Sequence, residues 1–240
     1  IPSWGITQMV ESEHKPRIAV RGAKQDIWRE AMNANDAIRI KYASKYAQSS
    51  NYWKNAMGMN EAIAKLKVIE GKEELEARFS NWVSQDTNRQ AKYGETLSML
   101  KDAYTNTMEA QKMLTYFGET FYNGIEIIRF ANTALFLKKS NPEDIATTFN
   151  RRVANTYKDY EPSLDRKVMP VLMKLYAESV PAEYLPDVYQ TINKKFKGDY
   201  DKYAEWFYKN TKFANIDAAS AFVGSAKDKD LEKDPAIILA

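Results

Sequence analysis

The longest periodic pattern in the chain covers residues 36–70, where hydrophobic side chains recur at helical spacing. No proline interrupts this segment, and at about 100° per residue its apolar positions share one side of a helix. Asn51 projects away from that side, with Asn55 one turn further on. The positions predicted to be buried are Ile38, Tyr42, Tyr46, Trp53, Met57 and Ile63, and the small residues around Asn51 are Ala43, Ser44, Ala47 and Gly58. The pattern therefore predicts one long helix with an aromatic core face. Its second face is small and polar, and is either solvated or a contact surface.

The same spacing predicts helices along most of the chain and no strand-like alternation dominates anywhere, so the fold class predicted is all-α. Asn35, Asp199 and Asn215 are predicted N-caps, and Gly71 is predicted to end the long helix. Ser140–Glu143 resembles a helix start, with a capping side chain, a proline and an acid. Further helices are expected at about 21–33, 72–91, 95–117, 121–137, from 143 to 155 or 157, from 161 onward, and at 187–195, 200–211 and 215–224.

The two ends of the chain read differently from its middle. Pro2, Gly5 and Pro16 predict an irregular or short extended arm over residues 1–17. Residues 227–240 begin with a run of alternating charges and end in an apolar, strand-like exit. We therefore expect one helical domain over residues 18–226, flanked by two linkers.

Composition narrows the classes of function. The chain has 240 residues, 44% hydrophobic content and a formal net charge of +3 with acids and bases interspersed, so no basic patch indicates a nucleic-acid partner. It contains no cysteine, which excludes disulfides, thiolate zinc sites and a cysteine nucleophile. The apolar runs are only a few residues long, far short of a membrane span.

The sequence holds no complete catalytic or cofactor-binding motif. His14 is the only histidine; we expect it to be an exposed loop residue rather than a metal ligand, and it has no nucleophile motif beside it. Phosphate-loop and dinucleotide glycine motifs are absent, so no cofactor and no metal are predicted. The isolated carboxylates Asp86 and Glu126 are interpreted as paired structural acids. The chain by itself is therefore predicted to be non-catalytic.

The stretch Tyr-Ala-Ser-Lys-Tyr-Ala-Gln-Ser-Ser-Asn-Tyr-Trp-Lys-Asn, residues 42–55, carries a family resemblance, and Gly-Met-Asn follows it at 58–60. Together with Ile18–Trp28 and Phe79–Val83, it resembles the signature of the bacterial dipeptidyl-peptidases of types seven and eleven. Those are serine exopeptidases with a chymotrypsin-like double β-barrel and a large inserted helical domain. The resemblance covers residues 18–83 strongly, and beyond them it is a helical pattern that fits the inserted domain.

The resemblance implies that this chain is the helical lid of such an enzyme, with residues 1–17 and 227–240 as its connections to a catalytic β-barrel. It implies that Asn51 binds the N-terminal amine of the peptide substrate, with Asn55 as a further candidate. It also implies a periplasmic, cell-surface or secreted location and allows a homodimeric parent. The alternative, from another class, is a self-contained helical scaffold whose small-residue face binds a partner protein.

Overall fold

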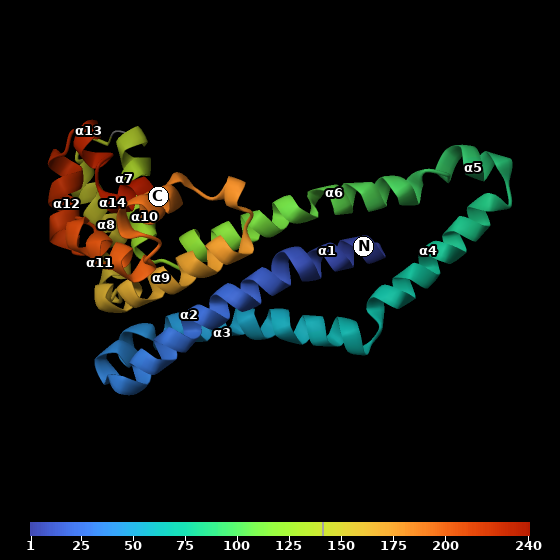
Figure 1. The fold of residues 1–240 in the computed structure, drawn as a ribbon, viewed down its shortest axis with the longest axis horizontal. Coiled ribbons are helices and arrows are strands. Elements are labelled where there is room, and N and C mark those ends of the chain that lie inside the picture. Colours follow the sequence, from blue (N-terminus) through green and yellow to red (C-terminus); the bar gives the residue numbers. More distant parts are fainter. Residues whose placement is uncertain (141) are drawn as a thin grey trace. The chain divides into compact units, whose positions relative to one another are not determined.

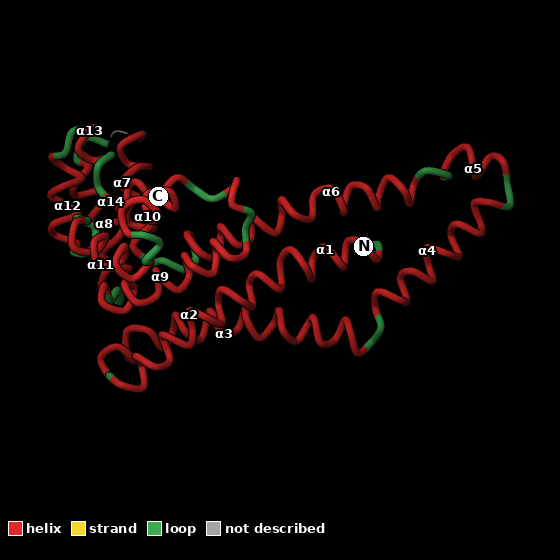
Figure 2. Tube along the Cα trace, in the orientation of Figure 1, coloured by secondary structure: helices red, strands yellow, loops and turns green. Residues whose placement is uncertain are grey.

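The computed structural model describes residues 1–140 and 142–240, and these residues form helices, turns and loops with no strand (Figures 1 and 2). The predicted all-α class is confirmed. The chain divides into two compact units: unit 1 holds residues 1–19 and 51–116, and unit 2 holds residues 20–50 and 117–240. The division falls inside α2 (Lys15–Ala34), inside α3 (Asp36–Lys65) and at the end of α6 (Thr96–Phe117). That residues 18–226 form one helical domain between two linkers stays a prediction.

The N-terminal residues of unit 1 are helical rather than irregular. α1 (Ser3–Met9) continues through a π-helical turn, η1 (Val10–His14), into α2. Pro2 occupies the N-cap of α1, where no backbone donor is needed. The π turn ends at His14, and Pro16 lies in the first turn of α2. The predicted extended arm is therefore wrong, because prolines at these positions do not stop the helix.

Unit 1 also contains α4 (Val68–Ser84) and α5 (Thr87–Tyr93). α1 is tied to α4 because the Ser3 backbone N–H and hydroxyl both donate to the Glu76 carboxylate at 2.7 Å. η1 is tied to α6 because the Ser12 hydroxyl donates to the Met108 carbonyl at 3.0 Å. Gly5 permits a close approach to α6, since a Cβ there would lie 2.9 Å from the Tyr104 ring. These polar contacts hold the N-terminal helix in place.

Several large apolar side chains are exposed, most of them in unit 1. The reason is that each helix of this unit packs against few others, so part of its apolar stripe faces solvent. Among the hydrophobic residues of the unit, Ile6, Ala56 and Val83 are fully buried. Met57, which the pattern had predicted to be inside, is exposed. The other large apolar side chains exposed in helical positions include Leu75, Trp82, Leu100 and Leu114 in unit 1 and Trp206 in unit 2.

The long helix ends earlier than the pattern predicts. α3 stops at Lys65, and Lys67 takes the left-handed conformation with φ 49° before α4 starts at Val68. Gly71 lies inside α4 and does not end a helix. The prediction was wrong because a lysine supplies the left-handed residue that glycine usually provides.

This placement makes Gly71 a site for stabilisation. We expect Gly71→Ala to raise the free energy of unfolding by about 0.5–1 kcal/mol, because glycine is disfavoured inside helices and nothing lies within 4 Å of the added Cβ. Urea denaturation measures the change. Gly124→Ala is the contrasting variant, since its Cβ would lie 2.4 Å from the Thr120 carbonyl oxygen, and it should destabilise the protein. A loss of stability in Gly71→Ala would contradict the placement.

Unit 2 holds the main hydrophobic core. Its elements besides parts of α2 and α3 are η2 (Gly118–Tyr122), α7 (Ile127–Ser140), α8 (Ile145–Lys158), α9 (Pro162–Ser179), η3 (Ala182–Tyr184), α10 (Asp187–Phe196), α11 (Tyr200–Asn210), α12 (Ile216–Ser225), α13 (Asp228–Leu231) and α14 (Pro235–Leu239). α7 packs against α8 and α14, and α9 packs against α11. Ile128, Phe130 and Leu137 of α7 are buried, so this helix is central to the core of unit 2.

The predicted caps can be compared with the structure one by one. The side chains of Asn35, Asp199 and Asn215 accept hydrogen bonds from the first turns of α3, α11 and α12, as predicted. Asp86, interpreted as a structural acid, caps α5 by accepting from the Arg89 N–H at 2.9 Å. Of the predicted start at residues 140–143, Asn141 lies outside the described residues. The cap of α8 is Asp144.

The C-terminal segment is helical and partly buried, so the strand-like exit was also wrong. Asp234 caps α14 and accepts from the Thr211 hydroxyl at 2.8 Å, and Pro235 occupies the first helical turn. Leu231 and Ile237 are buried. The charged run that precedes them had suggested a linker, but the apolar residues between the charges supply a packed face.

Candidate functional site

Asn51 and Asn55, the two candidate binding residues, are exposed on α3. Tyr52 beside them is 54% exposed, and Gly58 and Met59 continue the exposed surface one turn further on. The side of the helix that carries the asparagines therefore faces away from the packed interior, and their amides are open to a binding partner.

The opposite side of α3 is held by contacts within each unit. In unit 2 Tyr42 is fully buried and meets Trp28 edge to face at 5.2 Å, and Ser49 accepts a hydrogen bond of 3.3 Å from Gln25. In unit 1 the Trp53 indole N–H donates to the Ile18 carbonyl at 3.1 Å. The buried line runs through Tyr42, Ser49 and Ala56, so its period is seven residues, typical of paired helices.

His14 is buried rather than exposed on a loop, which corrects the prediction. It ends η1, and its Nδ1 donates to the Asn60 Oδ1 at 2.6 Å. Proline and acidic neighbours had suggested a loop there, whereas the π-helical turn directs the imidazole toward α3. Among residues 1–140 and 142–240 no group of three or more acidic or histidine side chains could hold a metal ion.

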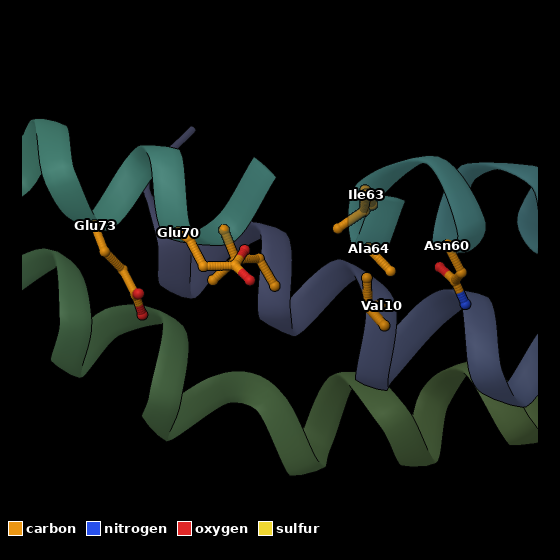
Figure 3. A pocket seen from close by; sticks show the side chains of 7 residues that line it. Val10, Asn60, Ile63, Ala64, Glu70 and Glu73 are labelled. Atoms are coloured by element: carbon orange, nitrogen blue, oxygen red, sulfur yellow. The ribbon is translucent and has the colours of Figure 1, made fainter. Parts of the chain in front are cut away.

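A pocket of about 470 Å³ lies in unit 1 close to this histidine. Its lining comes from η1, α3 and α4, shown in Figure 3: Val10, Asn60, Ile63, Ala64, Ile69, Glu70 and Glu73. The lining is apolar with two exposed carboxylates and one amide. It contains no nucleophile beside a base, so it does not form a hydrolytic site.

The ionisable groups with the most altered environment lie in unit 2. Burial raises the pKa of Asp165 from 3.8 to about 6, with a further increase from the negative charge of Glu126. Burial lowers the pKa of Lys24 to about 8, and its ammonium donates to the Asn123 carbonyl at 2.5 Å. Burial also raises the pKa of Tyr42, as does the charge of Glu126. These groups hold helices together, and none of them lies next to a nucleophile.

Glu126 is a paired structural acid, as interpreted from the sequence. It accepts from the Lys45 ammonium at 2.6 Å and from the Tyr42 hydroxyl. Lys45 could not be predicted as the partner of Glu126, because the two residues lie 81 positions apart and no local pattern connects them. Tyr42 was predicted to be buried, but its polar partner was not identified.

The family of this chain follows from its similarity to known proteins. The sequence matches the peptidase S46 family over residues 1–240. The chain belongs to this family. It is 44% identical over its full length to dipeptidyl-peptidase 7 of Porphyromonas gingivalis and 41% identical to dipeptidyl-peptidase 7 of Porphyromonas endodontalis. It spans 34% and 29% of those proteins, about a third of their length.

Solved structures support the fold of this S46 chain. A crystal structure of Porphyromonas endodontalis DPP11 matches with a TM-score of 0.80 at 23% identity, covering 99% of this chain and 35% of that one. The same protein in complex with the dipeptide Arg-Glu matches with a TM-score of 0.79 at 24% identity, covering 100% of this chain and 35% of that one. The helical fold therefore recurs in this solved protein. No helix among the described residues is long and apolar enough to cross a bilayer.

Proposed function

We propose that this chain is the helical substrate-gating domain of a serine dipeptidyl-peptidase, and that the exposed face of α3 binds the free N-terminal amine of the peptide. Membership of the peptidase S46 family and the dipeptidyl-peptidase names of its relatives support the reaction class. The exposure of Asn51 carries the assignment of the face. The family favours this function over a self-contained protein-interaction scaffold.

The proposal gives the chain a binding role and leaves catalysis to a β-barrel in the same longer protein. Removal of dipeptides requires the enzyme to measure two residues from a free amino terminus. A helical domain that closes one end of the cleft makes that measurement and excludes water from the reacting bond. The longer protein works in the periplasm or at the cell surface, where peptides are its substrates.

An asparagine suits the recognition of an ammonium group. Its amide oxygen accepts a charge-assisted hydrogen bond, which contributes about 1.5–3 kcal/mol. Because the amide is neutral, the site does not need to desolvate a second charge. α3 is anchored on its other side by Tyr42 and Trp53, so Asn51 stands on a fixed helix rather than a loop. A fixed acceptor orients the amine at low entropic cost.

The test is Asn51→Ala in the full-length dipeptidyl-peptidase. Loss of the charge-assisted hydrogen bond should lower kcat/KM for dipeptidyl substrates about 10- to 150-fold, mainly through a higher KM. Steady-state kinetics give this value, and circular dichroism with thermal melting checks that folding is unchanged. Asn55→Ala tests the second candidate in the same assay.

Asn106→Ala is the matched control, because Asn106 is an exposed asparagine on α6. It should have the kinetics of the unchanged enzyme. If Asn51→Ala also has those kinetics, Asn51 does not bind the amine.

A further inference from the structure

We infer that Tyr42, Lys45 and Glu126 are positioning residues, which fix the rotation of α3 about its axis and thereby the direction in which Asn51 faces. The inference rests on the proposed role of Asn51 in binding the peptide amine. It gives a functional role to the buried hydrogen-bond network of Tyr42, Lys45 and Glu126 in unit 2. These residues have no part in catalysis or in cofactor binding.

One turn of α3, which carries Tyr42 and Lys45, makes several hydrogen bonds to residues far away in the sequence. The Tyr42 hydroxyl donates to the Glu126 carboxylate, and the Glu161 N–H donates to the Tyr42 oxygen at 3.3 Å. The Lys45 ammonium donates to Glu126 at 2.6 Å and to the Asp159 carbonyl at 2.5 Å. Glu126 is 8% exposed and Tyr42 is fully buried. Solvent therefore cannot replace the hydrogen bond between Tyr42 and Glu126 when α3 turns.

Glu126 is itself held in place by hydrogen bonds to the buried Asp165. Its backbone N–H donates to the buried Asp165 carboxylate at 2.9 Å, and the Ile127 N–H donates to the same group at 2.9 Å. The Tyr208 hydroxyl also donates to Asp165, at 2.7 Å. Asp165 lies on α9 and Tyr208 on α11, so the chain of hydrogen bonds connects α3 to the core of unit 2. A carboxylate held in this way is a fixed reference for the helix.

The geometry of the α-helix relates the direction of the Tyr42 side chain to that of Asn51. Asn51 follows Tyr42 by nine residues in the continuous helix α3, which at 100° per residue places it about 180° away around the axis. Fixing the direction of Tyr42 therefore fixes Asn51 on the opposite side of the same helix. Side-chain tips lie about 5–6 Å from the axis, so a rotation of about 10° would move the Asn51 amide by about 1 Å. Displacements of that size are enough to weaken a catalytic or binding geometry markedly.

The experiment compares Tyr42→Phe and Lys45→Met in the full-length peptidase. Each should raise KM for dipeptidyl substrates about three- to tenfold and leave kcat within about twofold, because the substrate amine is misaligned while the catalytic groups stay in place. Both are assayed well below the melting temperature of the less stable variant. Lys45 is the less buried of the two, so Lys45→Met carries the test if Tyr42→Phe does not fold.

Glu119→Gln is the matched control for a merely structural effect. Glu119 is a buried carboxylate that accepts from Arg21 of α2 at 2.7 Å, in an ion pair at least as buried as that of Lys45 and Glu126. Weakening this pair should lower the melting temperature and leave KM unchanged. An equal rise of KM in Glu119→Gln would overturn the inference, since any loss of stability would then produce the effect.

A double-mutant cycle with Asn51→Ala separates this inference from the proposed function. If the positioning acts through Asn51, Tyr42→Phe should raise KM no further in the Asn51→Ala background. If Asn51→Ala raises KM but Tyr42→Phe and Lys45→Met do not, or if their effects multiply with it, the inference fails and the proposed function stands. If Asn51→Ala alone leaves KM unchanged, the proposed function fails and the inference fails with it.

Discussion

Replacing Phe130 by alanine is expected to lower the free energy of unfolding by about 3–5 kcal/mol, because a fully buried ring leaves a cavity that the core cannot close. Phe130 is 1% exposed and stacks on Tyr157, with ring centroids 3.7 Å apart and planes inclined by 10°. Tyr160 meets the same ring edge to face at 5.1 Å. The loss of these two aromatic contacts adds to the loss of buried area.

The matched control lies on the same helix. Phe136 of α7 is 55% exposed, and the Arg152 guanidinium covers its ring at 5.1 Å. Phe136→Ala should therefore cost no more than about 1 kcal/mol. Urea denaturation of both variants measures the difference. Equal losses would mean that α7 is not the central helix of unit 2.

Replacing Asp165 by asparagine is expected to cost about 1–3 kcal/mol at neutral pH for each buried donor that loses its partner. The buried carboxylate accepts from the N–H groups of Glu126 and Ile127 and from the Tyr208 hydroxyl. An asparagine has one oxygen in place of two, and its NH₂ group would face donors, so at least one buried donor would lose its partner. Asp165 therefore holds the first turn of α7 against α9 and α11.

The cost of this substitution should depend on pH. Burial and the charge of Glu126 raise the pKa of Asp165 from 3.8 to about 6, so between these values the folded protein binds more protons than the unfolded chain. The stability contributed by this group is therefore present at low pH and is lost as pH rises through about 6. Asparagine does not titrate. The difference between the two proteins should be larger at pH 5 than at pH 7.5.

Urea denaturation at pH 5 and at pH 7.5 measures the difference in free energy of unfolding between the unchanged protein and Asp165→Asn. An opposite trend with pH would contradict the raised pKa. A larger gap at pH 7.5 would show that the hydrogen bonds from the backbone and Tyr208 outweigh burial and hold the pKa of Asp165 below 3.8. In that case the carboxylate would stabilise the fold in its charged form.

Local signals in the sequence predicted the helices and many of their ends. The caps Asn35, Asp199 and Asn215 were predicted because a side-chain oxygen beside an unpaired backbone N–H is a local interaction. The N-terminal helix was missed because Pro2, Gly5 and Pro16 are helix breakers only in some positions. The end of the long helix was placed at Gly71 rather than at Lys67, because a left-handed lysine is rare and tertiary contacts decide where it is tolerated.

The candidate face could be predicted in part. The helical period of the sequence predicted that Tyr42 is buried and that Asn51 points away from it. In the structure Tyr42 is buried and Asn51 is exposed. The partners that fix the helix could not be predicted. Lys45 and Glu126 are 81 residues apart in the chain, and only the folded arrangement of α3, α7 and α9 brings their charges together. The family resemblance carried by residues 42–55 agrees with the match to peptidase S46.

The central claim is that the exposed face of α3 receives a peptide's free amino terminus. The most direct measurement is the structure of the full-length peptidase in complex with a bound peptide or dipeptide product. We expect the peptide amine to lie within hydrogen-bonding distance, about 2.7–3.2 Å, of the Asn51 amide oxygen. An amine held by other residues, with Asn51 left in solvent, would contradict it.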